Sequence, residues 1–143
     1  MRKYKVFFIS LLFIAVILVL LAWLLPVEHT VFLTADDTVK LGTESLDYRL
    51  VNLSLHTVYY GAYDWIERLD DGHWKRVETT MDLRYEMWLG VSSLLNRKAR
   101  QNMGCWLAAY DIDEPGRYRI AKPIEVGEEE AKYIIYREFT VTE

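Results

Sequence analysis

The sequence predicts an all-β protein: an antiparallel β-sandwich of about seven strands, preceded by a single transmembrane helix. An uncharged apolar run near the N-terminus predicts the helix. Short segments with a side-chain period of two, separated by turn signals, predict the strands. We therefore divide the chain into a short cytoplasmic tail with its anchor, residues 1–27, and an extracytoplasmic domain, residues 28–143.

The apolar run covers residues 6–25 and contains Ser10 as its one polar side chain. A helix of about 20 residues spans roughly 30 Å, the hydrocarbon thickness of a bilayer. The basic residues before the run are Arg2, Lys3 and Lys5. The next basic residue is Lys40, and positive charge stays on the cytoplasmic side of a membrane. We expect a single-pass cell-membrane protein with its N-terminus inside and its C-terminal domain outside.

A cleaved signal peptide is the main alternative, and a buried soluble helix is a third. The apolar region of a signal peptide is shorter, and small residues mark its cleavage site. Here no such pair of small residues ends the run, and Trp23 suits a membrane interface. Pro26 then ends the helix, because it disfavours helical geometry in the residue before it. These features favour an uncleaved signal-anchor.

Composition restricts the partners of the outer domain. The chain has 17 basic and 21 acidic residues, and three basic residues precede the run, so residues 28–143 carry a formal charge of −7. This charge disfavours nucleic acid and anionic lipid as partners, and solubility alone explains it. The single cysteine, Cys105, excludes an internal disulfide. Its apolar neighbours predict a buried, unreactive thiol.

The strand predictions rest on alternation and on turn residues. The clearest early strand places Leu46, Tyr48 and Leu50 on one face. The residues 70–72, Asp-Asp-Gly, predict a hairpin turn because glycine accepts a positive φ. Strands are predicted at residues 30–35, 45–53, 65–69, 73–78, 98–109, 116–123 and 133–141.

Aromatic side chains gather before and within this hairpin: Tyr59, Tyr60, Tyr63, Trp65 and Trp74. Such a cluster serves either core and cross-strand packing or a ligand platform. The sequence leaves both interpretations open. As the candidate binding site we take Tyr59, Tyr60, Tyr63 and Trp65, because one inward strand face cannot bury so many rings.

The remaining segments carry weaker signals. Residues 79–96 follow neither period and predict a loop with a short strand or helical turn. The basic cluster Arg97, Lys98 and Arg100 predicts a solvated turn, and the acidic run 128–130 a solvated hairpin tip. The turn at 111–116 offers too few oxygens for calcium, and Asn52 begins an N-x-S sequence that we interpret as unused.

Two stretches resemble a known family. The first runs from Tyr60-Gly61 to Asp71-Gly72-His73-Trp74, and the second is the Pro-Gly-Arg-Tyr-Arg-Ile sequence of residues 115–120. Together they resemble the bacterial immunoglobulin-like domains of surface-anchored or secreted proteins of Gram-positive bacteria, over about residues 30–142. The resemblance implies an immunoglobulin-like sandwich with no shared active site. It also places Tyr118 where such sandwiches have their tyrosine corner.

Nothing in the sequence predicts catalysis. His29, His56 and His73 are scattered, and no nucleophile, metal or phosphate-loop motif is present. We therefore predict a non-enzymatic, cofactor-free binding module that is held at the membrane by its N-terminal helix. Its expected partner is another surface protein or envelope component. The alternative is a single-pass subunit or regulator of a membrane complex.

Overall fold

The structure is a computed structural model that describes residues 2–24, 27–79, 93–127 and 131–143. Within the N-terminal helix, side chains are described for residues 8 and 10–20. Among the residues described, no helix combines the length and the apolarity needed to cross a membrane.

Two helices precede the strands, and a short 3-10 helix lies among the later strands. The helices are α1 (Arg2–Leu24), α2 (Val27–Thr30) and the 3-10 helix η1 (Leu107–Ala109). The first strands are β1 (Val31–Ala35), β2 (Thr38–Lys40), β3 (Leu46–Asn52), β4 (Val58–Tyr60), β5 (Trp65–Asp70) and β6 (His73–Arg76). The later strands are β7 (Ser93–Leu95), β8 (Ala99–Cys105), β9 (Gly116–Val126) and β10 (Ala131–Thr142).

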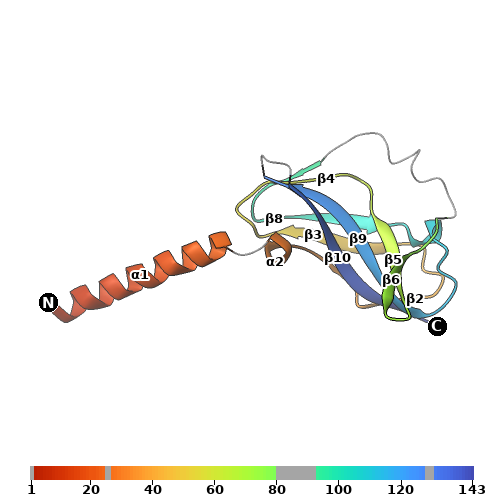
Figure 1. Ribbon diagram of the computed structural model, residues 1–143, viewed down its shortest axis with the longest axis horizontal. Coiled ribbons are helices and arrows are strands. Elements are labelled where there is room, and N and C mark those ends of the chain that lie inside the picture. Colours follow the sequence, from red (N-terminus) through yellow and green to blue (C-terminus); the bar gives the residue numbers. More distant parts are fainter. Residues whose placement is uncertain (1, 25–26, 80–92, 128–130) are drawn as a thin grey trace.

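The strands form two sheets that pack face to face (Figure 1). The smaller sheet has the order β1-β3-β8. The larger sheet has the order β2-β10-β9-β4-β7, with β5 also paired to β9 and β6 paired to β5. All pairs are antiparallel except β2 with β10. The predicted β-sandwich is therefore confirmed.

The core forms where the alternating faces of the two sheets meet. In β3 the predicted inward residues Leu46, Tyr48 and Leu50 are all buried. The facing strands β9 and β10 bury their own alternate residues, which include Tyr118, Ile120, Ile135, Phe139 and Val141. Cys105 is a free, buried cysteine within this core, as predicted. Period-two burial on both sheets is what holds the sandwich together.

The predicted hairpin is present as β5 and β6. Its turn places Asp71 at φ 50° and Gly72 at φ 79°. Two consecutive positive φ values are typical of the tight turn that matches the twist of the flanking strands. The resulting register pairs Glu67 with Arg76 and Leu69 with Trp74.

The structure differs from the sequence prediction at short or irregular elements. The predicted strand 98–109 ends at Cys105, and η1 follows it. The short strands β2 and β4 were not predicted as separate elements, because three residues carry too little alternation to identify. Strand β7 lies within residues 79–96, for which a short strand was one of the two predicted alternatives. Of the segment 79–96, residues 80–92 lie outside the described residues, as does the acidic run 128–130.

A break interrupts the edge that β9 presents to β4 and β5. Strand β5 pairs with β9 as far as Ala121, whereas β4 pairs with it from Ile124 onward. The segment 61–64 connects the two pairings. Its backbone groups leave the ladder there, so they need other hydrogen-bond partners.

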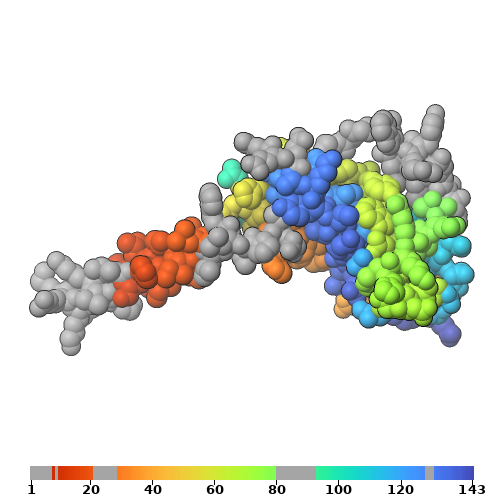
Figure 2. Space-filling model, viewed as in Figure 1, coloured from red at the N-terminus to blue at the C-terminus, as the bar shows by residue number. Residues whose placement is uncertain are grey.

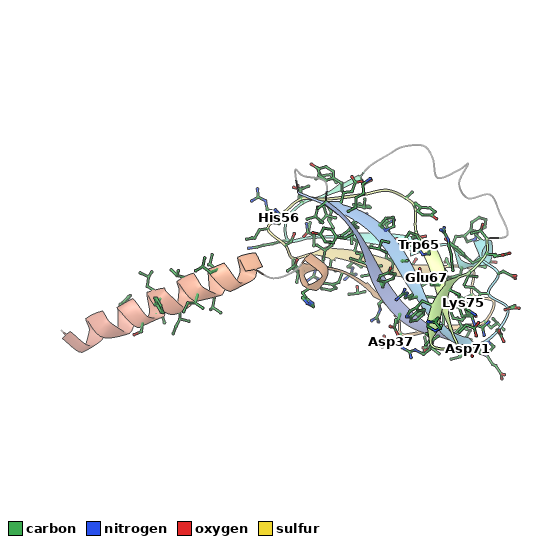
Figure 3. All side chains as sticks on the ribbon, in the orientation of Figure 1. Asp37, His56, Trp65, Glu67, Asp71 and Lys75 are labelled. Carbon is green, nitrogen blue, oxygen red and sulfur yellow. The ribbon has the colours of Figure 1, made fainter. Side chains whose placement is uncertain are left out.

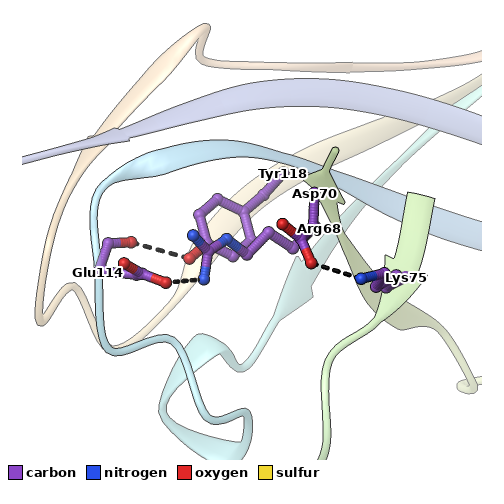
Figure 4. A network of polar contacts seen from close by, with 5 residues as sticks. All are labelled: Arg68, Asp70, Lys75, Glu114 and Tyr118. Atoms are coloured by element: carbon purple, nitrogen blue, oxygen red, sulfur yellow. Dashed lines mark hydrogen bonds and ion pairs between the residues drawn. The ribbon is translucent and has the colours of Figure 1, made fainter. Parts of the chain in front are cut away.

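Tyr118 forms the predicted tyrosine corner. Its side chain is 1% exposed, and its hydroxyl donates to the Glu114 carbonyl oxygen at 2.8 Å (Figure 4). Arg68 lies over the Tyr118 ring, 5.9 Å from the centroid, and ion-pairs with the Glu114 carboxylate. The turn before β9 is thereby fixed by one hydroxyl and one guanidinium.

We predict that Tyr118→Phe lowers the free energy of unfolding by about 1–3 kcal/mol, because the Glu114 carbonyl loses its buried donor. Urea unfolding measures this loss. The matched control is Tyr136→Phe, since Tyr136 is 42% exposed and should tolerate the change. Equal losses in the two variants would contradict the role of the corner.

Candidate functional site

The four aromatic residues of the predicted binding site are divided by the structure. Tyr59 and Tyr60 are consecutive in β4, so their side chains lie on opposite faces of the sheet. Tyr60 packs against the core, and the Lys122 ammonium lies 6.0 Å from its ring centroid. Tyr59 lies opposite Glu125 and is half-buried. Tyr63 and Trp65 come together with ring centroids 5.6 Å apart.

Arg76 joins the pair formed by Tyr63 and Trp65. Its guanidinium carbon lies 5.1 Å from the Trp65 ring centroid and 5.6 Å from that of Tyr63. It also donates a hydrogen bond to the Tyr63 hydroxyl. A guanidinium over an aromatic face is attracted by the ring quadrupole. The three side chains therefore fix one another's positions.

A second arginine continues this surface across the sheet. The guanidinium carbon of Arg119 lies 4.4 Å from the ring centroid of Trp74 and 3.8 Å from that of Tyr136. It pairs with Glu67 at 2.5 Å, and Glu67 in turn accepts a hydrogen bond from the Trp65 indole at 2.8 Å. The side chains of Arg119 and Glu67 are 18% and 14% exposed, so solvent screens this pair only in part.

These side chains form one surface, which we call the aromatic–arginine face: Tyr63, Trp65, Glu67, Trp74, Arg76, Arg119 and Tyr136. It lies on the outer side of the larger sheet, where β5 pairs with β9, and Figure 2 shows the β5–β6 hairpin in green beside the blue strands of this sheet. Figure 3 shows Trp65 and Glu67 close together on this hairpin.

Sequence reasoning found part of this face. The aromatic cluster indicated Tyr63 and Trp65, but not the residues that neighbouring strands bring to them. Outward alternation in β9 and β10, together with the hairpin register, could have indicated Arg119, Tyr136 and Arg76. Whether the face binds a partner is not tested by the geometry, so the binding site remains a prediction.

Beneath this face, Lys122 supports the connecting segment 61–64 from the interior. Its side chain is fully buried, and its ammonium donates to the Gly61 carbonyl at 2.7 Å and to the Tyr63 carbonyl at 2.9 Å. These two oxygens belong to the segment that leaves the β9 edge. The lysine therefore supplies donors that strand pairing does not provide there.

Asp64 is the buried acid of the same interior network. Its carboxylate accepts from the Tyr48 hydroxyl at 2.8 Å and from the Cys105 thiol at 3.7 Å. Its backbone oxygen accepts from the Tyr110 hydroxyl at 2.9 Å. Tyr48 and Cys105 belong to the smaller sheet, so this network links the two layers of the sandwich.

Burial and charge act in opposite directions in this network. Burial raises the pKa of Asp64, while the Lys122 ammonium and the two hydrogen bonds lower it. Burial likewise lowers the pKa of Lys122, and the Asp64 carboxylate raises it. Burial, followed by the charge of Asp64, raises the pKa of the Cys105 thiol. A thiol of this kind is a poor nucleophile.

We predict that Lys122→Met lowers the free energy of unfolding by about 3–5 kcal/mol at neutral pH, because it leaves the Asp64 charge buried without a cation. The loss should be smaller near pH 4. Without Lys122 the pKa of Asp64 in the folded protein rises further above its ordinary value of 3.8. A folded-state pKa above the ordinary value makes the protein lose stability as the pH rises above that value. Urea unfolding at both pH values measures the difference.

The double variant Asp64→Asn with Lys122→Met is the control for this prediction. It removes the uncompensated charge while it keeps the lysine substitution, so it should be more stable at neutral pH than Lys122→Met alone. A double variant that is no more stable than the single one, or a loss that does not change with pH, would contradict the charge interaction between Asp64 and Lys122.

Among the described residues, no group of three or more His, Cys, Asp or Glu side chains is placed to hold a metal ion. The side chain of Asn52, which begins the N-x-S sequence, is fully buried. Its amide donates to the carbonyl oxygens of His56, Leu95 and Asn96. The folded chain therefore does not present this asparagine for glycosylation.

Comparison with solved structures returns chains of low sequence identity and low TM-score. One of them is a structural genomics target, to which this chain is 10% identical with a TM-score of 0.46. The match covers 82% of this chain and 90% of the target chain. This chain is 14% identical to the PapD-like domain 7 of human CEP192, with a TM-score of 0.39 and coverage of 82% and 87%. It is 10% identical to the periplasmic chaperone SfaE, with a TM-score of 0.41, and that match covers 76% of this chain and 54% of the chaperone chain. No curated protein matches the chain.

The family of the chain is shown by comparison with protein-family models and not by the solved structures. The model of the bacterial Ig-like domain matches residues 27–140, which is nearly the whole of the chain after α1. The match agrees with the two-sheet fold and with the tyrosine corner described above. The chain belongs to the family of bacterial Ig-like domains.

Proposed function

We propose that the protein is a non-catalytic interaction module that binds a protein partner of the cell envelope through its aromatic–arginine face. The single observation that carries the proposal is the composition of that face. Tyrosine, tryptophan and arginine are the residues that contribute most often to the energy of protein interfaces. Here they occur together on one side of one sheet.

The internal contacts of the face also favour binding. The ring of Trp65 is fixed by the hydrogen bond to Glu67 and by the Arg76 guanidinium. Arg119 is held between Trp74 and Tyr136. Side chains that are ordered before association lose less conformational entropy when a partner binds. The face therefore needs little rearrangement to form an interface.

We predict that Tyr63→Ser with Tyr136→Ser abolishes capture of the partner when intact cells are crosslinked and the protein is purified. The rings supply apolar contact area that serine lacks. The matched control is Trp106→Ser, because Trp106 is 50% exposed and lies next to β8 in the other sheet. Melting temperatures must be equal in all three proteins. Retention of every partner by the double variant would rule out this face.

We also propose that α1 tethers this module to the cell membrane, with the domain outside the cytoplasm. The support comes from the uncharged run at residues 6–25 and from the basic residues before it. In the described part of α1, the large apolar side chains are 40–71% exposed. A helix that is apolar on all sides requires an apolar environment. The exposed side chains are Phe8, Leu11, Leu12, Phe13, Ile14, Val16, Ile17, Leu18, Val19 and Leu20.

We predict that a protease added to intact, wall-stripped cells digests the domain and leaves the N-terminal segment in the membrane fraction. The positive-inside rule places the domain on the outer side. A cytoplasmic protein that stays intact is the control for cell integrity. Protection of the domain, or a mature N-terminus near Val27, would overturn the tethered topology.

A further inference from the structure

The end of the sandwich that follows α1 in the chain carries exposed leucines and basic residues. Only residues 25 and 26 separate α1 from α2, and β1 begins directly after α2. Figure 1 shows both helices at this end of the sandwich, and Figure 3 shows His56 at the same end, with Asp71 at the opposite one. We call this region the anchor end.

The loop after β3 forms one part of the anchor end. The Leu53 amide donates to the Thr30 carbonyl oxygen at 2.7 Å, so this loop lies directly beside the end of α2. Leu53 and Leu55 are 50% and 38% exposed. Ser54 between them is buried and bonded to the Asn52 side chain at 2.6 Å. The loop therefore projects two leucines while its centre is fixed to the core.

The turn before β8 forms the second part. The Asn52 side-chain amide donates to the carbonyl oxygens of His56, at 2.9 Å, and of Asn96, at 3.1 Å. One buried side chain thus holds both loops together. Arg97 and Lys98 follow in an exposed turn, in which Lys98 has a φ of 54°. The two cations therefore lie in a turn that Asn52 joins to the loop carrying the two leucines.

We propose that the anchor end rests on the phospholipid surface into which α1 inserts, with Leu53 and Leu55 at the interface and Arg97 and Lys98 at the lipid phosphates. The proposal rests on the membrane tether proposed above. Apolar side chains flanked by basic ones are typical of segments that lie in a membrane interface. Long basic side chains reach phosphate groups while their aliphatic stems stay in apolar surroundings.

The short connection keeps the anchor end close to the membrane surface in a tethered chain. Seven residues lead from Leu24 to Val31, and even a fully extended chain of that length spans at most about 25 Å. Residues 27–30 are helical and so rise only about 1.5 Å each. The headgroup layer on one side of a bilayer is itself roughly 5–8 Å thick. The loop bonded to Thr30 therefore lies at or near that layer.

The occupant is phospholipid in general and not anionic lipid. The domain as a whole is acidic, with a formal charge of −7 over residues 28–143. This net negative charge opposes attraction to an anionic surface. Insertion of the leucines does not depend on lipid charge.

The test uses the full chain reconstituted in phosphatidylcholine vesicles. Leu55→Cys carries an environment-sensitive fluorophore, and Asp71→Cys, at the opposite end, is the matched control. The unsubstituted chain should take up no label, because Cys105 is 1% exposed. We expect blue-shifted emission, quenched by nitroxide lipid, at position 55 and not at position 71. An Arg97→Cys variant should be quenched by a headgroup nitroxide.

Flotation of the vesicles separates the possible failures. If the chain floats with the vesicles but position 55 emits as in water, the tether stands and the contact is wrong. If the chain does not float, the tether is wrong and the contact falls with it. Quenching at position 55 that requires an anionic lipid would overturn the assignment to phospholipid in general.

Discussion

The structure depends on the way in which the Lys122 ammonium completes an interrupted strand edge. Where β4 and β5 separate, the Gly61 and Tyr63 carbonyls lose their place in the ladder, and Lys122 donates to both. A buried ammonium is costly unless all of its partners are in place. The charge of Asp64 offsets part of that cost. The break in the sheet and the buried charges therefore form one arrangement.

That arrangement joins the interior to the outer surface. The backbone of Tyr63 accepts from Lys122 on the core side, while its ring meets Trp65 and Arg76 on the outer side. Asp64 follows directly and is bonded to Tyr48 of the opposite sheet. The segment that carries Tyr63 is thus fixed by the core and not by the hairpin alone. Pre-organisation of this kind lowers the entropic cost of association.

The sequence could predict the parts of the fold that depend on local pattern. Alternation identified β3 and β10, the Asp71-Gly72 turn identified the hairpin, and the position of Tyr118 identified the corner. Pairings between distant segments could not be predicted in this way. The period of β9 points Lys122 inward, but its two acceptors lie 61 and 59 residues earlier in the chain. Only the folded register brings them together.

The same distinction explains why the candidate site was predicted in part. A density of aromatic residues indicates that rings gather, but it does not say which side of the sheet receives each ring. Alternation in β4 sends Tyr60 to the core and Tyr59 away from it. Three other strands then supply Trp74, Arg119 and Tyr136, which complete the surface around Trp65. In a sandwich, a face of this kind belongs to the sheet and not to any one segment, because neighbouring positions on a sheet come from different strands.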